Sequence, residues 1–136
     1  MQFSKLLKYR IVLGAFLVAP VFTVFAATVE HSGTISAHTT WSNTDVHLIT
    51  GNVTVASGVI LTIEPGTVVK FNSGRRMNIA GALDAQGTAV DKIYFTSYRD
   101  DTVGGDTNEN GPSNGQANDW QRIQFDSTVT PSLTHF

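Results

Sequence analysis

The sequence of 136 residues predicts an all-β solenoid, in which short strands wind into stacked parallel coils. A pattern of branched apolar residues and glycine turns occurs twice between Gly51 and Ser97, and its Gly-Thr pair recurs in the second copy. A unit this short cannot enclose a core alone and must lie on a copy of itself. The first copy contains Leu61, Gly66, Thr67, Val69, Lys70 and Phe71, and the second contains Leu83, Gly87, Thr88, Val90, Lys92 and Phe95.

The segment 1–26 predicts a cleaved signal peptide. Three basic residues precede an apolar run at 11–25, and small residues near Ala26 offer a cleavage site. An uncleaved anchor helix would need about 18 apolar residues, whereas this run is shorter and is interrupted by Gly14 and Pro20. We therefore expect a secreted, extracellular or cell-surface protein, with the periplasm left open, that contacts a membrane only transiently through this segment.

Charge and cysteine content narrow the classes of partner. Three of the nine Lys and Arg residues lie in the signal segment, so the processed chain has six against eleven Asp and Glu, a net charge near −5. This balance argues against nucleic acid, whose phosphates require clustered cations, and against docking on an anionic membrane. The chain has no cysteine, so its stability must come from packing, a bound metal or additional chain.

Residues 27–50 are expected to form an N-terminal cap. The stretch is rich in Thr, Ser and His, and its apolar residues indicate two short strands on either side of Trp41. The first coil of a solenoid has an edge of unpaired N–H and C=O groups, and natural proteins cover such edges against sheet-to-sheet association.

Residues 51–136 are expected to form the coils. Apolar residues alternate with a period of two between glycine turns, which is typical of strands and too short for helices. At one turn, Pro65-Gly66 fits the central positions of a type II turn, where glycine accepts a positive φ. The alternation predicts an interior of Val53, Val55, Leu61, Ile63, Val69, Phe71, Ile79, Leu83, Ile93, Phe95, Ile123 and Phe125.

A polar loop at 98–119 interrupts the coils. It is rich in Asp, Asn and Gly and has hardly any apolar residue. The strand pattern resumes at Trp120, and the chain ends where a further strand would begin. Because a solenoid needs polar terminal units and about three repeats, we expect this chain to be the N-terminal piece of a longer protein, with two to three coils.

The repeats resemble the start of bacterial secreted right-handed parallel β-helix proteins. The resemblance covers residues 41–136 and depends on the segments 59–71, 81–88, 93–97 and 104–108, together with the later Trp120 and Ile123. It implies a three-sided coil stack with pectate-lyase-like architecture, found on larger exported or surface proteins, some of which act on polysaccharides. It carries over no catalytic residue, and a fold alone does not settle function.

The segment Asp106-Thr107-Asn108-Glu109-Asn110-Gly111 matches the opening of a calcium loop. Oxygen ligands stand at alternate positions, at Asp106, Asn108 and Asn110, and glycine stands at the sixth position, where the turn is sharp. The twelfth position, where an EF-hand has a bidentate Glu, is Ala117, and no helices flank the loop. Calcium therefore stands beside the alternative of an ordinary solvated turn, and such an ion would order the loop rather than catalyse a reaction.

Other chemistry-bearing residues favour structural roles. The four histidines have no tight metal spacing and no nucleophile elbow. The adjacent Asp100 and Asp101, and Glu64, Asp84 and Asp91 at turns, do not indicate the two opposed carboxyl groups that glycoside hydrolysis requires. Two tryptophans, Trp41 and Trp120, are expected to pack near strands rather than stack on sugars. The pair Arg75-Arg76 fits a solvated turn.

The expected function is that of an exported, noncatalytic β-helix scaffold at the surface or outside the cell, contacting polysaccharide or a cell-surface partner. The alternative is the N-terminal segment of a polysaccharide lyase or glycoside hydrolase whose catalytic residues lie beyond this chain. For the chain by itself the sequence favours the scaffold and leaves enzymatic activity undecided.

Overall fold

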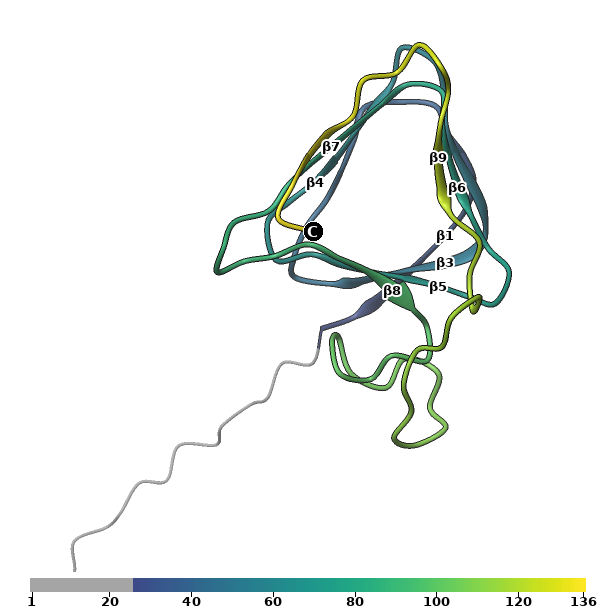
Figure 1. Cartoon of the computed structure of the whole chain (residues 1–136), viewed down its shortest axis with the longest axis vertical. Coiled ribbons are helices and arrows are strands. Elements are labelled where there is room, and N and C mark those ends of the chain that lie inside the picture. The colour runs from purple at the N-terminus through teal and green to yellow at the C-terminus, as the bar shows by residue number, and fades with distance from the viewer. Residues whose placement is uncertain (1–25) are drawn as a thin grey trace, which may run out of the picture.

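A computed structural model describes residues 26–136, which form an all-β solenoid of about three turns with a triangular cross-section (Figure 1). The signal peptide expected at 1–26 lies outside the described residues except for Ala26. Every strand pairing is parallel, and the described part of the chain contains no helix that could cross a membrane. The all-β parallel β-helix predicted from the repeats is therefore confirmed.

The strands form two sheets that together make three sides. One sheet has the order β8-β5-β3-β6-β9 with β1 paired to β3, and the other has the order β10-β7-β4-β2. The bounds are β1 Thr28–Ile35, β2 Thr39–Trp41, β3 Val46–Val55, β4 Ile60–Ile63, β5 Val68–Phe71, β6 Met77–Ile79, β7 Ala82–Gln86, β8 Tyr94–Ser97, β9 Ile123–Phe125 and β10 Ser132–Thr134.

The longer strand β3 turns a corner of the triangle and so joins two sides. Its first half pairs with β5, where Val46 is opposite Val68, and its second half pairs with β6, where Val53 is opposite Met77. In Figure 1 the chain passes from β5 to β6 to β7 around the triangle while it rises toward the viewer, which gives the coil a right-handed path. The segment expected as a cap supplies β1 and β2, which extend the ladders of the three sides.

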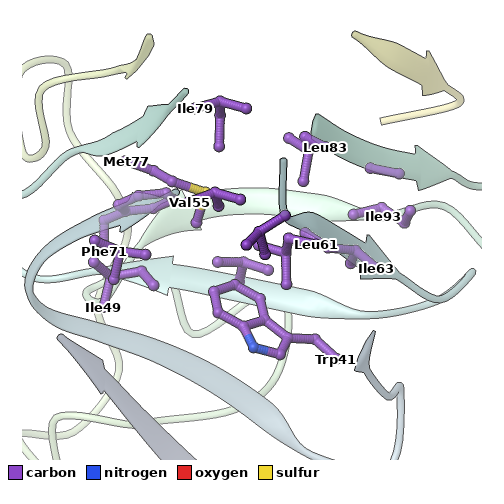
Figure 2. Close-up of a cluster of buried hydrophobic side chains, with 14 residues drawn as sticks. Trp41, Ile49, Val55, Leu61, Ile63, Phe71, Met77, Ile79, Leu83 and Ile93 are labelled. Atoms are coloured by element: carbon purple, nitrogen blue, oxygen red, sulfur yellow. The ribbon is translucent and has the colours of Figure 1, made fainter. Parts of the chain in front are cut away.

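The interior is an apolar ladder of equivalent positions on successive coils (Figure 2). Nine of the twelve residues expected inside are buried, with Val55, Val69 and Phe71 fully so. The remaining three, Phe95, Ile123 and Phe125, are half-buried and pack against this core from the last strands. Further buried members are Trp41, Ile49, Val59, Met77 and Ala85. Parallel strands lie about 4.8 Å apart, so each coil shields the apolar side chains of the next from water.

The second Gly-Thr pair does not occupy the position that the repeat suggested. Leu61 pairs with Leu83 as expected, but Val69 pairs with Phe95, because the turn before β8 is longer than the turn before β5. The N–H of Gly66 consequently donates to the carbonyl of Asp91 and not to a group of Gly87. Val90, expected to match the buried Val69, is 89% exposed. Gly66 itself has a φ of +83°, as the type II turn requires.

Candidate functional site

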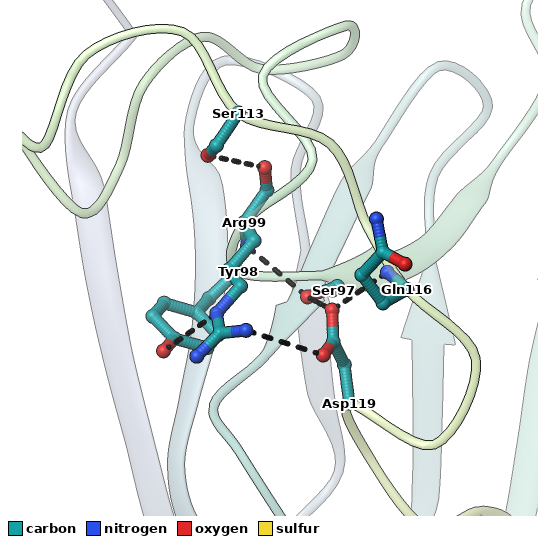
Figure 3. Close-up of polar contacts among 6 residues, drawn as sticks. All are labelled: Ser97, Tyr98, Arg99, Ser113, Gln116 and Asp119. Atoms are coloured by element: carbon teal, nitrogen blue, oxygen red, sulfur yellow. Dashed lines mark hydrogen bonds and ion pairs between the residues drawn. The ribbon is translucent and has the colours of Figure 1, made fainter.

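The polar loop leaves the solenoid after β8 and returns before β9, at one corner of the triangle (Figure 1). Its two ends are joined by Ser97 and Asp119, which we call the clasp. The hydroxyl of the buried Ser97 donates to Oδ2 of Asp119 at 2.7 Å, and the same oxygen accepts the backbone N–H of Gln116 at 2.8 Å (Figure 3). The clasp therefore holds the start and the end of the loop together.

The clasp is supported by charge and by a second tie. Nη1 of Arg99 lies 3.7 Å from Oδ1 of Asp119. The hydrogen bonds from Gln116 and Ser97, and then the charge of Arg99, lower the pKa of Asp119. Deeper in the loop, Ser113 donates its hydroxyl to the carbonyl oxygen of Arg99 at 2.7 Å (Figure 3). An ionised carboxylate with a fixed set of donors keeps this loop in one shape.

A buried lysine ties the middle of the loop to the outer face of the sheet. Lys70 alternates with the interior residues Val69 and Phe71 on β5, so its side chain points outward, yet it has no exposed surface. Nζ donates to the carbonyl oxygen of Gly105 at 2.5 Å. Burial lowers the pKa of Lys70, and the nearby Asp101, Asp100 and Asp106 act in the opposite direction. Lys70 therefore supplies positive charge beneath an acidic loop.

Glycine is required where the loop meets the sheet. Gly104 has a φ of +67°, and a Cβ there would lie 3.1 Å from side-chain atoms of Val46 and Val68 and 3.3 Å from Cε of Lys70. A side chain at this position would be strained in conformation and would push the loop away from the sheet. The loop thus depends on Gly104 for its close approach.

The residues of the expected calcium loop form a closed turn. Oδ2 of Asp106 accepts the N–H of Gly111 at 2.9 Å, and Oδ1 accepts the N–H of Asn110 at 3.4 Å. The amide atoms of Asn108 are buried and make no hydrogen bond within the described residues. No group of three His, Cys, Asp or Glu residues able to hold a metal occurs within 26–136. The two bonds to Asp106 close the turn without an ion, and calcium binding stays a prediction.

A cavity of about 370 Å³ lies between β8 and the base of the loop. Asp100 faces it, and its carboxylate accepts hydrogen bonds from the hydroxyls of Thr96 at 2.6 Å and Thr102 at 2.5 Å. Burial would raise the pKa of Asp100, but the bonds from Thr102 and Thr96 outweigh that effect and lower it. The cavity is lined by Phe95, Thr96, Ser97, Asp100, Thr102, Asn114, Gly115, Gln116 and Trp120.

Trp120 combines a packing role with a place in this cavity. Its ring stacks on Phe71 with centroids 4.3 Å apart and planes 12° apart, so one face continues the core. The side chain is only half-buried and also lines the cavity. The packing expected for Trp120 is present, and the sequence did not indicate that the same ring would border a polar cavity.

At the opposite end of the solenoid, two histidines meet above Trp41. His47 Nε2 lies 3.0 Å from the carbonyl oxygen of Ser42, and His47 Nδ1 lies 2.8 Å from His31 Nε2. A carbonyl only accepts, so His47 Nε2 carries a proton and Nδ1 accepts the N–H of His31. Both rings stack on Trp41, with centroids 4.2 and 5.0 Å away. Burial, and then His47, lowers the pKa of His31 to about 4, and burial lowers the pKa of His47.

The remaining candidate residues each make a hydrogen bond with a different partner and do not come together in one site. Asp101 turns away from Asp100 and accepts the backbone N–H of Ser113 at 2.6 Å. Asp84 on β7 accepts from Gln86 at 2.7 Å, and His38 accepts the N–H of Ile60 at 3.0 Å. Asp84, expected at a turn, therefore lies within a strand, and among the described residues the polar groups gather at the loop base rather than at these positions.

The comparisons with known proteins give one partial similarity. No protein-family model matches the chain, and no solved structure matches it. A stretch of 81 residues, 60% of this chain, is 31% identical to part of Protein bark beetle from Drosophila melanogaster. The matched stretch spans only 2% of that protein's length, so the similarity concerns a local segment. It lends no support to the bacterial or pectate-lyase-like part of the resemblance.

Proposed function

We propose that the chain is an exported, noncatalytic β-helix scaffold that presents the polar loop at 98–119 to a polysaccharide outside the cell. The observation that carries the proposal is the fixing of this loop on the solenoid by the clasp, by Lys70 and by Ser113. Binding groups occur disproportionately on loops that a rigid scaffold positions. A loop of this composition, tied at three places, fits presentation of polar groups better than it fits a plain connection.

The protonation states of the loop carboxylates favour a binding role over a catalytic one. Glycoside hydrolysis needs one carboxyl group that stays protonated as an acid, which requires a raised pKa. The pKa values of Asp100 and Asp119 are lowered instead, and both side chains accept hydrogen bonds within the loop. The alternative, a lyase or hydrolase, would place its reaction on residues beyond this chain.

Export is part of the proposal and depends on the segment 1–26. Its basic start and apolar run are typical of a signal peptide, and the resemblance to secreted β-helix proteins points the same way. A calcium ion at Asp106, Asn108 and Asn110 is a separate proposal that would add to the order of the loop. N-terminal sequencing of the protein recovered from the medium tests export, since the proposal requires a chain that begins near Ala27.

Cosedimentation of the processed chain with insoluble polysaccharides tests the binding role. The matched variant replaces residues 99–118 by a short Gly-Ser linker, which leaves Lys70 free to face water. We expect the original chain to sediment with polysaccharide and the variant to stay in solution, with the same β-type circular dichroism spectrum. Equal sedimentation of both proteins would exclude the loop as the binding element, and failure of both to sediment would contradict polysaccharide binding.

A further inference from the structure

We propose that the cavity at the base of the loop binds an uncharged hexopyranose unit of a polysaccharide, with Trp120 as the apolar platform and Asn114 and Gln116 as hydrogen-bonding groups. This inference deepens the proposed function and rests on it. It assigns the contact with polysaccharide to one place and excludes acidic sugars as the preferred ligand.

The cavity has the size and rigidity of a small-ligand site. Its volume of about 370 Å³ lies within the range of roughly 300 to 1,000 Å³ common for such sites. One wall is the end of β8, and the other wall is the loop. The clasp fixes Ser97 between these walls, and the stack on Phe71 fixes Trp120. A ligand therefore meets a wall at Ser97 and a ring at Trp120 that are already ordered, which reduces the entropy cost of binding.

The lining groups complement a pyranose ring. A sugar ring presents apolar C–H faces and a rim of hydroxyl groups, and a tryptophan offers a broad apolar surface with one N–H donor. Asn114 and Gln116 are exposed at the cavity, and an amide side chain both donates and accepts. Within the described residues, their side-chain amides make no hydrogen bond to protein, unlike the carboxylate of Asp100. These two amides are therefore free to bond hydroxyl groups.

Charge selects against acidic sugars. Asp100 is the one charged residue among those that line the cavity, and its lowered pKa keeps it ionised near neutral pH. Lys70, the cation that acts on Asp100, has no exposed surface and already donates to Gly105, and the neighbouring Arg99 is paired with Asp119. A uronate or sulfated unit would thus meet a carboxylate without a compensating cation, which disfavours it relative to an uncharged unit.

Gly115 sets the width of the cavity. A Cβ at this position would lie 3.2 Å from Cβ of Ser97 and 3.5 Å from Cβ of Asp100, and both neighbours belong to the lining. Gly115→Val would therefore narrow the cavity from the loop side. This substitution fills space without removing a hydrogen-bonding group, and equal hydrogen exchange at the Ser97–Asp119 clasp in the variant would show that only the space has changed.

Calorimetry and tryptophan fluorescence on the full processed chain test the assignment. The probes are uncharged gluco- and N-acetylglucosamine oligosaccharides, with an oligogalacturonate as the acidic counterpart. Because the other tryptophan, Trp41, is 2% exposed, a fluorescence change on binding would report Trp120. We expect the double variant Asn114→Ala/Gln116→Ala to bind an uncharged oligosaccharide about tenfold more weakly. Gly115→Val should also bind weakly, whereas Gln124→Ala, which removes an exposed amide of β9 outside the cavity, should bind as the original chain does.

The outcomes separate this inference from the proposed function. Binding of an uncharged oligosaccharide that all three cavity substitutions leave unchanged would place the sugar elsewhere and overturn the inference, while the scaffold role would stand. Tighter binding of the oligogalacturonate would overturn the ligand class. Absence of binding to every oligosaccharide and to the insoluble polysaccharides would overturn both proposals together.

Discussion

The coils and the loop are ordered by different means. In the coils, each interior side chain lies on an equivalent one from the neighbouring coil, as Leu61 does on Leu83, so burial is shared along a ladder. In the loop, order depends on single pairs such as Ser97 with Asp119 and Lys70 with Gly105. When one interior residue of the coils is replaced, its neighbours on the adjacent coils still hold the strand in place. When one residue of a loop pair is replaced, that contact is lost outright. Substitutions in the loop can therefore change its shape or its ligand while the coils keep their structure.

The largest expected loss of stability comes from truncating an interior side chain of the coils. Ile63 is 1% exposed, and Ile63→Ala should lower the free energy of unfolding by about 2 to 5 kcal/mol because it leaves a cavity between coils. Phe95→Ala should cost less, since Phe95 is half-buried on a terminal strand. Urea unfolding followed by circular dichroism measures both. An unchanged midpoint for Ile63→Ala would contradict the stacked interior.

The second effect comes from removing the cation beneath the loop. Lys70→Met should lower the free energy of unfolding by about 1 to 3 kcal/mol, because it leaves the Gly105 carbonyl without its donor and removes the positive charge near Asp101, Asp100 and Asp106. Hydrogen exchange should accelerate at 99–118 and stay slow in β3 and β5. Lys92→Met is the matched control, since Lys92 is exposed and should show neither change. Faster hydrogen exchange throughout the coils would mean that the loop and the coils do not open independently.

A smaller effect concerns pH at the opposite end of the solenoid. The pKa of His31 is about 4 in the folded protein and near 6.5 when unfolded, so the unfolded state binds more protons between these values. The free energy of unfolding should have its full value above pH 6.5 and should fall by about 1 to 2 kcal/mol as the pH drops to 4. This figure is reduced to allow for the partial exposure of His31. Asp45 near His47 opposes part of this loss. The melting temperature should change less steeply with pH in His31→Phe than in His135→Gln. Equal slopes of melting temperature against pH would refute the assignment.

Calcium should have the smallest effect. An ion held at Asp106 with dissociation near 10⁻³ M would stabilise the protein by roughly 0.4 kcal/mol at millimolar calcium. Differential scanning calorimetry with and without a chelator would show a melting temperature lower by a few degrees at most. Asn108→Ala should abolish that difference if Asn108 is a ligand. An identical melting temperature with and without chelator removes calcium from the loop.

The coils were predictable because their information is local and repeated. Alternation with a period of two identifies Val53, Val55 and Leu61 as interior positions, and all three are buried. The register of the next coil was not predictable in the same way. The turn before β8 is longer than its counterpart, so a copied Gly-Thr pair lies out of phase and Val90 reaches solvent. A sequence repeat indicates stacking but does not fix the length of each turn.

The candidate site was harder to predict because its contacts are neither local nor periodic. Lys70 is far from Gly105 in the sequence, and the loop that contains Gly105 has no alternation that would fix a register. His31 and His47 lie on strands whose pairing shifts at a bulge between His31 and Gly33. The signal available in the sequence was a lysine between two interior positions of a strand, which indicates an outward side chain but not what covers it.

The corner between β8 and β9 shows how much chain the ladder accommodates without losing its pairing. Met77 lies opposite Ile123, whereas on another side Ile60 lies opposite Ala82, so the coil that contains this corner holds far more chain than its neighbour. The entropy of closing a loop rises only logarithmically with its length. Foreign peptides of varied length grafted at this corner should therefore be displayed on an intact solenoid, which makes the corner a natural point of diversification.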